Sequence, residues 1–326
     1  MNKSPSQTAY IHSAVALGAQ KDYLPEQRRA LRADPQPTDL KELTRQVTGQ
    51  NLRQASHFVE LAATGSQLCL QRLAQPAPTA TAVYVGTGLA EVRKTRILFA
   101  QVMPPGPGSA SPFDFINSAN NMAAFYVAKL AGISARNLTV MAEEFSFEQA
   151  LVLAISDLHC GECAAALVGG VDENSSPREQ HLRHIDLRDD QVMGEGSSWL
   201  YLTRDREGAL GEVLNVESLP AYATNTSWLE TTAAHLEQWV KHDGSAKLLA
   251  GFRMTSEEIV ALLRRIPALK AEKYLDNCGC FFSAAAFGLA TAFDHRAASS
   301  QLYLHINRDA AGNAMIVALR VFGSGD

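Results

Sequence analysis

The chain has 326 residues, of which 46% are hydrophobic and 19% charged, so it can bury a large core as one α/β domain or as two packed halves. Its formal net charge of −5 and its lack of a basic run make nucleic acid a poor partner. No stretch of about 18 apolar residues is present and the N-terminus lacks a signal-peptide pattern, so we expect a cytoplasmic protein without a membrane span.

The first half of the sequence alternates between the periodicities of strands and helices. Two acids, Glu143 and Glu144, open one helix and suit the positive end of its dipole, and Gly161 closes it. The Gly- and Pro-rich stretch over 102–117 favours a loop. In chain order we expect a strand at 11–17, two helices over 39–73 broken near Gly49, a strand at 81–87, a helix from about 117 to 132, a strand at 137–142, the helix ending at 161, and strands over 163–173, 193–204 and 211–219.

The second half repeats this alternation of strands and helices with shorter segments, which indicates an internal duplication. Before it, the segment SSPREQHLRHIDLRDD over 175–190 predicts a solvated, charged loop, although His181, His184 and Asp186 could be considered as metal ligands. The expected elements are a helix at 227–241, a strand at 247–252, helices at 256–266 and 283–293, and strands at 301–307 and 313–322 joined by a hairpin turn.

Three stretches resemble the β-ketoacyl synthase family: TVMAEEFSFEQALVLAISDLHCGECAAALVGGVDE, MGEGSSWLYLTRDREGALGEVL and CGCFFSAAAFGLATAF. The most specific feature is the Gly-Glu-Gly of the second stretch, which opens an apolar strand. Shorter similarities lie in VYVGTG and in SPFDFINSANNMAAFYVAKLAGI, so the resemblance covers most of 80–205 and is looser elsewhere. It implies an α/β fold of the thiolase-like, five-layered αβαβα type.

The same resemblance implies two duplicated halves, 1–205 and 206–326, that form one compact unit. The chain is shorter than a full ketosynthase, and we expect the missing residues to fall between about 220 and 247. The strand at 137–142 corresponds to the strand that pairs across the dimer axis in the family.

Ketosynthases condense acyl thioesters with a Cys nucleophile at a helix N-terminus and two His residues that stabilise the developing oxyanion. The nucleophile position matches Glu144, or Glu143 or Phe145 if the register slips by one residue. The two His positions match Ala250 and Cys280, and the gating turn, here NRDAAGNAMIVAL, has lost its Phe. The resemblance therefore implies no catalytic residues, no cofactor and no metal.

Several of these residues permit more than one interpretation. Glu144 is either a stabilising acid at a helix N-terminus or a base or carboxylate mimic, with Arg253 as a candidate partner. Cys280 is either a small packing thiol or a nucleophile with His295 or His305 as its base.

The five cysteines, an odd number in a chain without an export signal, predict reduced thiols. Cys160 and Cys163 form a CxxC pair, and Cys278 and Cys280 form a CxC pair. Together these four thiolates could bind a zinc ion. The resemblance places the two pairs at opposite ends of the helix over 144–159, roughly 22 Å apart at 1.5 Å per residue, which argues against zinc. A redox role is disfavoured because the CxxC ends a helix instead of beginning one.

Together these features predict a non-catalytic subunit of the chain-length-factor type. It would pair with an active β-ketoacyl synthase, shape the acyl tunnel of a type II polyketide or fatty-acid-like system, and meet acyl carrier protein through that complex; an aryl-polyene pathway is the finer hypothesis. Candidates for the tunnel or interface are Phe113, Phe115, Met122, Phe125, Thr139, Met141 and Phe145. The alternative for Phe113, Phe115, Met122 and Phe125 is that they are ordinary core residues.

Two other functions remain open at this stage. One is a stand-alone acyltransferase or thioester hydrolase that uses Cys280 or Glu144. The other is a regulatory or structural binding protein built on the same scaffold.

Overall fold

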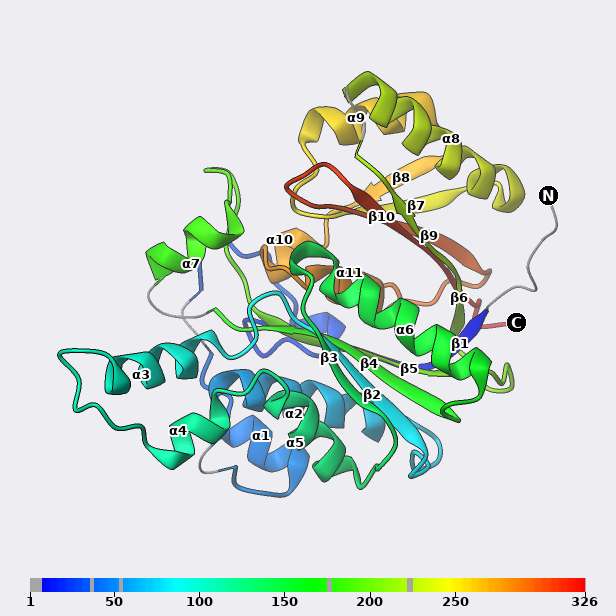
Figure 1. Cartoon of the computed structure of the whole chain (residues 1–326). Coiled ribbons are helices and arrows are strands. Elements are labelled where there is room, and N and C mark those ends of the chain that lie inside the picture. Colours follow the sequence, from blue (N-terminus) through cyan, green and yellow to red (C-terminus); the bar gives the residue numbers. More distant parts are fainter. Residues whose placement is uncertain (1–7, 36–37, 53–54, 175–177, 222–224, 326) are drawn as a thin grey trace.

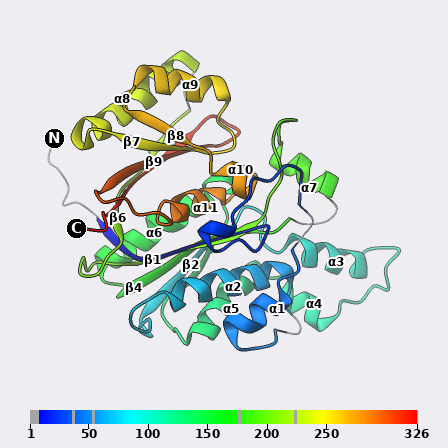
Figure 2. The ribbon, with the colours of Figure 1, turned by 180° about the vertical axis from the view of Figure 1, so that it is seen from behind.

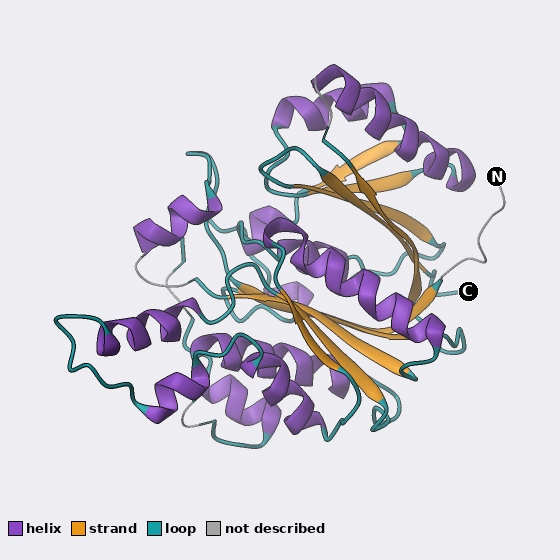
Figure 3. Ribbon diagram, viewed as in Figure 1, coloured by secondary structure: helices purple, strands orange, loops and turns teal. Residues whose placement is uncertain are grey.

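The computed structural model describes residues 8–35, 38–52, 55–174, 178–221 and 225–325. Its strands form one continuous ten-stranded sheet in the order β3-β2-β4-β5-β1-β6-β10-β9-β7-β8. The sheet turns near β1 and β6, so that its two halves face each other with helices α6 and α11 between them (Figures 1 and 2). Further helices cover both outer faces, and this layering is the expected thiolase-like αβαβα fold (Figure 3).

In the first half of the sheet, β3, β2 and β4 run parallel, while β4, β5 and β1 run antiparallel. Residues 9–11 at the start of β1 also pair with β6, and this pairing joins the two halves. In the second half, β6, β10 and β9 are antiparallel and β9, β7 and β8 are parallel. The strands are β1 (Ala9–Gly18), β2 (Thr81–Gly86), β3 (Asn137–Val140), β4 (Ala165–Asp172), β5 (Gly196–Thr203), β6 (Gly211–Leu219), β7 (Ala246–Ala250), β8 (Leu269–Glu272), β9 (Gln301–Arg308) and β10 (Ala314–Val321).

The helices end where the sequence predicts, because Gly49, Gly132 and Gly161 adopt the left-handed backbone conformation that glycine tolerates best. A 3-10 turn, η2 (Glu143–Phe145), precedes α6, and another, η1 (Pro25–Gln27), follows β1. The α-helices are α1 (Lys41–Thr48), α2 (His57–Gln71), α3 (Val92–Val102), α4 (Pro112–Asn117), α5 (Met122–Ala131), α6 (Ser146–Cys160), α7 (Arg178–Ile185), α8 (Asn225–Asp243), α9 (Ser256–Arg265), α10 (Leu275–Cys278) and α11 (Ala284–Thr291).

Two expectations about loops were wrong. The stretch over 102–117 contains α4, whose first residue, Pro112, has the fixed φ that suits a helix start. The stretch over 175–190 contains α7, and both His181 and Ile185 on this helix are buried. Helix α3, which lies before the first of these stretches, was not predicted at all.

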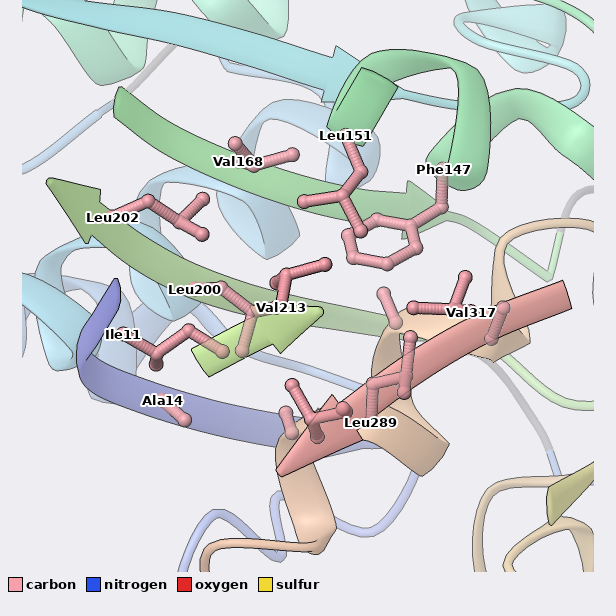
Figure 4. Close-up of a cluster of buried hydrophobic side chains, with 14 of the residues drawn as sticks. Ile11, Ala14, Phe147, Leu151, Val168, Leu200, Leu202, Val213, Leu289 and Val317 are labelled. Carbon is pink, nitrogen blue, oxygen red and sulfur yellow. The ribbon is translucent and has the colours of Figure 1, made fainter. Parts of the chain in front are cut away.

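The central core lies between the two halves of the sheet, around α6 and α11. Helix α11 fits there because it consists mainly of small side chains and is buried over residues 284–290. Figure 4 shows part of this core, with Phe147 and Leu151 of α6 packed toward Val168 and Leu200 of the sheet. The nucleophile turn predicted at the start of α6 therefore adjoins the central core.

Two further cores lie under the outer helices, one below α2 and α5 and the other below α8 and α9. Within the part of the chain that the structure describes, no helix is both long enough and apolar enough to cross a bilayer. The predicted boundary at residues 205–206 falls in the turn between β5 and β6, and the division into two halves stays a prediction.

Candidate functional site

The turn between β3 and α6 forms the rim of a surface pocket. Glu143 has a φ of +47°, which is uncommon for a residue with a side chain. Ser146 holds this turn, because its hydroxyl accepts from the Ala142 N–H at 2.9 Å and donates to the Glu143 carbonyl at 2.7 Å. Glu143 remains exposed, whereas Glu144 turns inward and its side chain is 1% exposed.

Glu144 is neutralised by Arg253. The Arg253 Nε donates to Glu144 Oε1 at 2.6 Å, and the arginine side chain is itself only 14% exposed. Its guanidinium also lies 5.3 Å from the ring centroid of Phe252 and donates, at 3.4 Å, to the exposed carboxylate of Asp186. The candidate partner from the sequence is therefore confirmed, and the ion pair lies at the helix start that the sequence resemblance matches to the nucleophile of the family.

A second polar group lies deeper, along the inner side of the same turn. The side-chain amide of Asn307, near the end of β9, donates to the Glu144 carbonyl at 2.5 Å and to Glu148 Oε1 at 3.0 Å. Gly251 allows this approach, since a Cβ there would lie 2.3 Å from Asn307 Oδ1. Asn307 thus ties the nucleophile turn and the first turn of α6 to the second half of the sheet.

Glu148 shares this buried space with His305. His305 Nδ1 lies 3.8 Å from Glu148 Oε1, and His305 Nε2 is 3.0 Å from the Tyr274 hydroxyl. Burial raises the pKa of Glu148 to about 7 and lowers the pKa of His305 to about 3, because both charged forms lose their hydration. At neutral pH the imidazole is therefore uncharged, and it is engaged with Tyr274.

Asp172, the last residue of β4, holds the other side of the pocket. Its carboxylate accepts from the Thr87 hydroxyl and the Gly88 N–H at 2.9 Å, and from the Ser283 N–H at 2.8 Å. Burial raises the pKa of this carboxyl. These bonds fix the loop after β2 against the start of α11 and so position Gly88 at the pocket.

The pocket itself is open to solvent and has a volume of about 510 Å³. Gly88, Met141, Ala142 and Glu143 line it. The lining therefore offers one carboxylate, one thioether and backbone, with no thiol or imidazole among these four residues.

The two positions matched to the family His residues carry no acid–base group suited to neutral pH. Ala250 ends β7 and pairs with Ile306 of β9. Cys280 is buried in an apolar cluster with Ile185, Met193, Phe252 and Phe282, and burial raises its pKa to about 12. The thiol form of Cys280 therefore predominates at neutral pH, which makes it a poor nucleophile.

The alternative bases for Cys280 are not arranged for that role. His305 is hydrogen-bonded to Tyr274, and His295 is exposed in the turn after α11. Cys160 lies at the end of α6 and Cys280 just before α11, and all five thiols are free. Among the described residues, no three or more His, Cys, Asp or Glu side chains are grouped to hold a metal ion.

The tunnel and interface candidates are mostly at the surface. Phe113 and Phe115 on α4, Phe125 on α5 and Met141 after β3 are exposed, so the alternative that Phe113, Phe115 and Phe125 are ordinary core residues was wrong. The remaining candidates, Met122, Thr139 and Phe145, are partly buried.

Sequence reasoning missed Asn307, Glu148 and Asp172 as parts of the site. Asn307 opens the segment that is matched to the gating turn of the family. Asp172 ends a Gly-Gly-x-Asp strand, and a carboxylate at the end of a buried strand was a signal that could have been followed.

Comparisons with known proteins agree with this geometry. The sequence profile of the β-ketoacyl synthase N-terminal domain matches residues 22–184, which is half of the chain. The chain therefore belongs to the β-ketoacyl synthase family. No curated protein matches the sequence.

Solved structures show the same fold at low sequence identity. A structure described as "The ishigamide ketosynthase/chain length factor" is 17% identical with a TM-score of 0.74, covering 97% of this chain and 100% of that chain. One described as "AntDE:AntF (apo): type II PKS acyl-carrier protein in complex with its ketosynthase bound to the hexaketide" is 14% identical with a TM-score of 0.73, over 97% and 99%. A β-ketoacyl synthase from Burkholderia phymatum STM815 is 14% identical with a TM-score of 0.70, over 96% and 99%.

Proposed function

We propose that this chain is a non-catalytic, ketosynthase-like subunit of the chain-length-factor type, which pairs with an active β-ketoacyl synthase. The observation that carries the proposal is the buried Glu144–Arg253 ion pair at the nucleophile position. A carboxylate held by a guanidinium at the start of α6 cannot form the thioester on which condensation depends. The partner would therefore supply the cysteine and both histidines.

The surface around β3 supports the pairing. β3 is the outermost strand at one end of the sheet, and an open strand edge favours pairing with another chain. The exposed apolar side chains of Phe113, Phe115, Phe125 and Met141 lie on α4, on α5 and directly after β3. Large apolar side chains that are exposed on neighbouring elements are typical of protein interfaces.

In the complex, the same apolar residues would line an acyl tunnel shared by the two subunits. Met122, Thr139 and Phe145 would line its partly buried portion. A type II polyketide or fatty-acid-like pathway, and within this class an aryl-polyene pathway, is the setting we propose, with the acyl chain delivered by acyl carrier protein in the cytoplasm.

A stand-alone acyltransferase or hydrolase is less consistent with the site. Cys280 would have to be a thiolate and would need a base beside it. However, its pKa is raised to about 12, and His305 is hydrogen-bonded to Tyr274. Glu144 would need access to substrate, but its side chain is 1% exposed and held by Arg253.

The test is co-expression with a complete ketosynthase encoded beside this chain, followed by size-exclusion chromatography with mass determination. We expect a stable one-to-one heterodimer. The double variant Phe125→Arg/Met141→Arg should abolish it, because charges would replace apolar contacts. The matched control is Val260→Arg, a similarly exposed apolar position on α9, which should leave the heterodimer intact. A homodimer that ignores the ketosynthase would contradict the proposal.

A further inference from the structure

A cluster of buried titratable side chains lies next to Asp172 and takes no part in the site described above. Glu91 directly precedes α3, Glu173 directly follows β4, Glu195 directly precedes β5, and His57 begins α2. The three glutamates are buried, and the His57 side chain is only 9% exposed. We call these four residues the acid cluster.

Glu195 is the member of the acid cluster whose burial is compensated. Its carboxylate accepts hydrogen bonds of 2.9 Å from the N–H groups of Thr38 and Asn174, and it lies 2.9 Å from His57 Nε2. Burial opposes a positive charge on His57, but the hydrogen bond and the charge of Glu195 outweigh this effect and raise the pKa of the imidazole. Both oxygens of Glu195 therefore have donors.

Glu173 has no such compensation. It is 4% exposed, and neither of its carboxyl oxygens forms a hydrogen bond within the described residues; the Arg93 N–H lies nearby but outside hydrogen-bonding geometry. Burial and the charges of Glu91 and Glu195 raise the pKa of Glu173 to about 8, although His57 and the Arg93 N–H favour its charged form. A buried carboxylate without donors costs much more than the neutral acid, so Glu173 fits this position with its proton bound.

Helix α3 depends on polar contacts for its place on the protein. It has no buried residue, and it projects beside the outer helices in Figures 1 and 2. Glu91 accepts a hydrogen bond from the Ser56 hydroxyl at the start of α2, and its other carboxyl oxygen has no partner among the described residues. The charge of Lys94 acts on Glu91, but Lys94 is itself paired with Asp114 of α4 at 3.1 Å. A negative charge on Glu173 would therefore repel the residue that fastens α3 to α2.

We propose that Glu173 is a pH-sensitive switch that controls the attachment of α3 to the start of α2. With its proton bound, Glu173 is neutral beside Glu91 and Glu195, and the bond between Ser56 and Glu91 holds α3 in place. Without the proton, the lack of donors and the repulsion from neighbouring carboxylates favour a state in which α3 detaches and water reaches Glu173. The switch goes beyond the proposed function, because it concerns the fold of this chain and needs no ketosynthase.

The direction of the effect follows from the two states of Glu173. Its pKa is about 8 when α3 is attached and its usual 4.5 when water reaches it, so attachment is strongest below pH 4.5 and weakens as pH rises toward 8. The ratio of detached to attached α3 should rise by about tenfold per pH unit between about pH 5 and pH 8, and level off above about pH 8. His57, Glu60 of α2 and Glu91 also have raised pKa values, so their loss of protons acts in the same direction.

The test is hydrogen–deuterium exchange with mass spectrometry on the purified chain between pH 6 and pH 8.5, corrected for the pH dependence of chemical exchange itself. In the wild type, we expect opening of the α3 amides to rise about tenfold per pH unit up to about pH 8. Glu173→Gln is neutral at every pH and should lose most of this slope. The amides of α9, another surface helix, serve as the internal reference. The control Glu179→Gln removes an exposed carboxylate on α7 and should keep the wild-type slope.

Each outcome supports or overturns the switch. A slope that is absent in the wild type, or that Glu173→Gln retains in full, overturns it. A slope that Glu148→Gln abolishes also overturns it, because unfolding linked to that carboxyl would then explain the exchange. If Glu173→Gln does not fold, Glu173→Leu decides, since an apolar side chain of similar size binds no proton and should likewise remove the slope. Chromatography with the ketosynthase tests the subunit role separately, and none of these exchange results bears on it.

Discussion

Removing Arg253 should reveal how strongly the ion pair at the nucleophile position is coupled to stability. In Arg253→Met, the Glu144 carboxylate stays buried, with its side chain 1% exposed, but loses its counter-charge. Breaking a buried pair from one side costs about 3 to 5 kcal/mol, whereas replacing both partners by neutral groups costs far less. We therefore expect a loss of about 3 kcal/mol in the free energy of unfolding, and recovery of most of it in Glu144→Gln/Arg253→Met.

Urea unfolding followed by tryptophan fluorescence at fixed protein concentration measures this cycle, because Trp199 and Trp228 are buried. Urea is preferred to a guanidinium salt, which would screen the charges. The control is Arg265→Met, which breaks an exposed pair with Glu237 and should cost less than about 1 kcal/mol. If Arg253→Met costs no more than this control, the pair does not lock the site and our reasoning about Glu144 fails.

Three further predictions concern the same region. Because burial raises the pKa of Glu148 from its usual 4.5 to about 7, this carboxyl contributes stability that is lost as pH rises from about 4.5 through 7, so the wild type should lose about 3 kcal/mol relative to Glu148→Gln in urea unfolding compared at pH 5 and pH 8; equal pH profiles of the two proteins would contradict this. Brief treatment with iodoacetamide at pH 7.5 should label the exposed Cys160 and leave Cys280 unmodified in peptide mass spectra, since burial raises the pKa of Cys280 to about 12; rapid labelling of Cys280 would revive it as a nucleophile. Gly251→Ala should lower stability by about 1 to 3 kcal/mol, because its Cβ would meet the Asn307 side chain, and a wild-type melting temperature would show that Asn307 can move aside at no cost.

The layered fold could be predicted because it follows from local patterns. Buried strands such as β4 are continuous apolar runs, and helices such as α6 end at glycines, so their positions can be derived without tertiary information. Family resemblance then gave the arrangement of these elements, and the same resemblance located Glu144 at the start of α6.

Two of the helices that were missed, α3 and α4, share a physical cause. Helix α3 has no buried residue and exposes Phe99, and α4 exposes Phe115. Without a buried face, a helix lacks the apolar periodicity on which prediction depends.

The polar interior of the site was beyond sequence reasoning for a different reason. Glu148 and Asn307 are 159 positions apart, and only the closed fold brings them within 3.0 Å. The Glu144–Arg253 pair, 109 positions apart, could be anticipated because the family match placed both residues near one pocket. Polar pairs of this kind carry no periodic signal, so only tertiary structure or a family template reveals them.

The central claim is that this chain contributes no nucleophile to the complex. The most direct measurement is intact-protein mass spectrometry of both subunits after the purified heterodimer is incubated with acyl-loaded acyl carrier protein. We predict an acyl adduct on the ketosynthase subunit and an unchanged mass for this chain. An acyl adduct on this chain, above all one that persists when the nucleophilic cysteine of the ketosynthase is replaced by alanine, would contradict the claim.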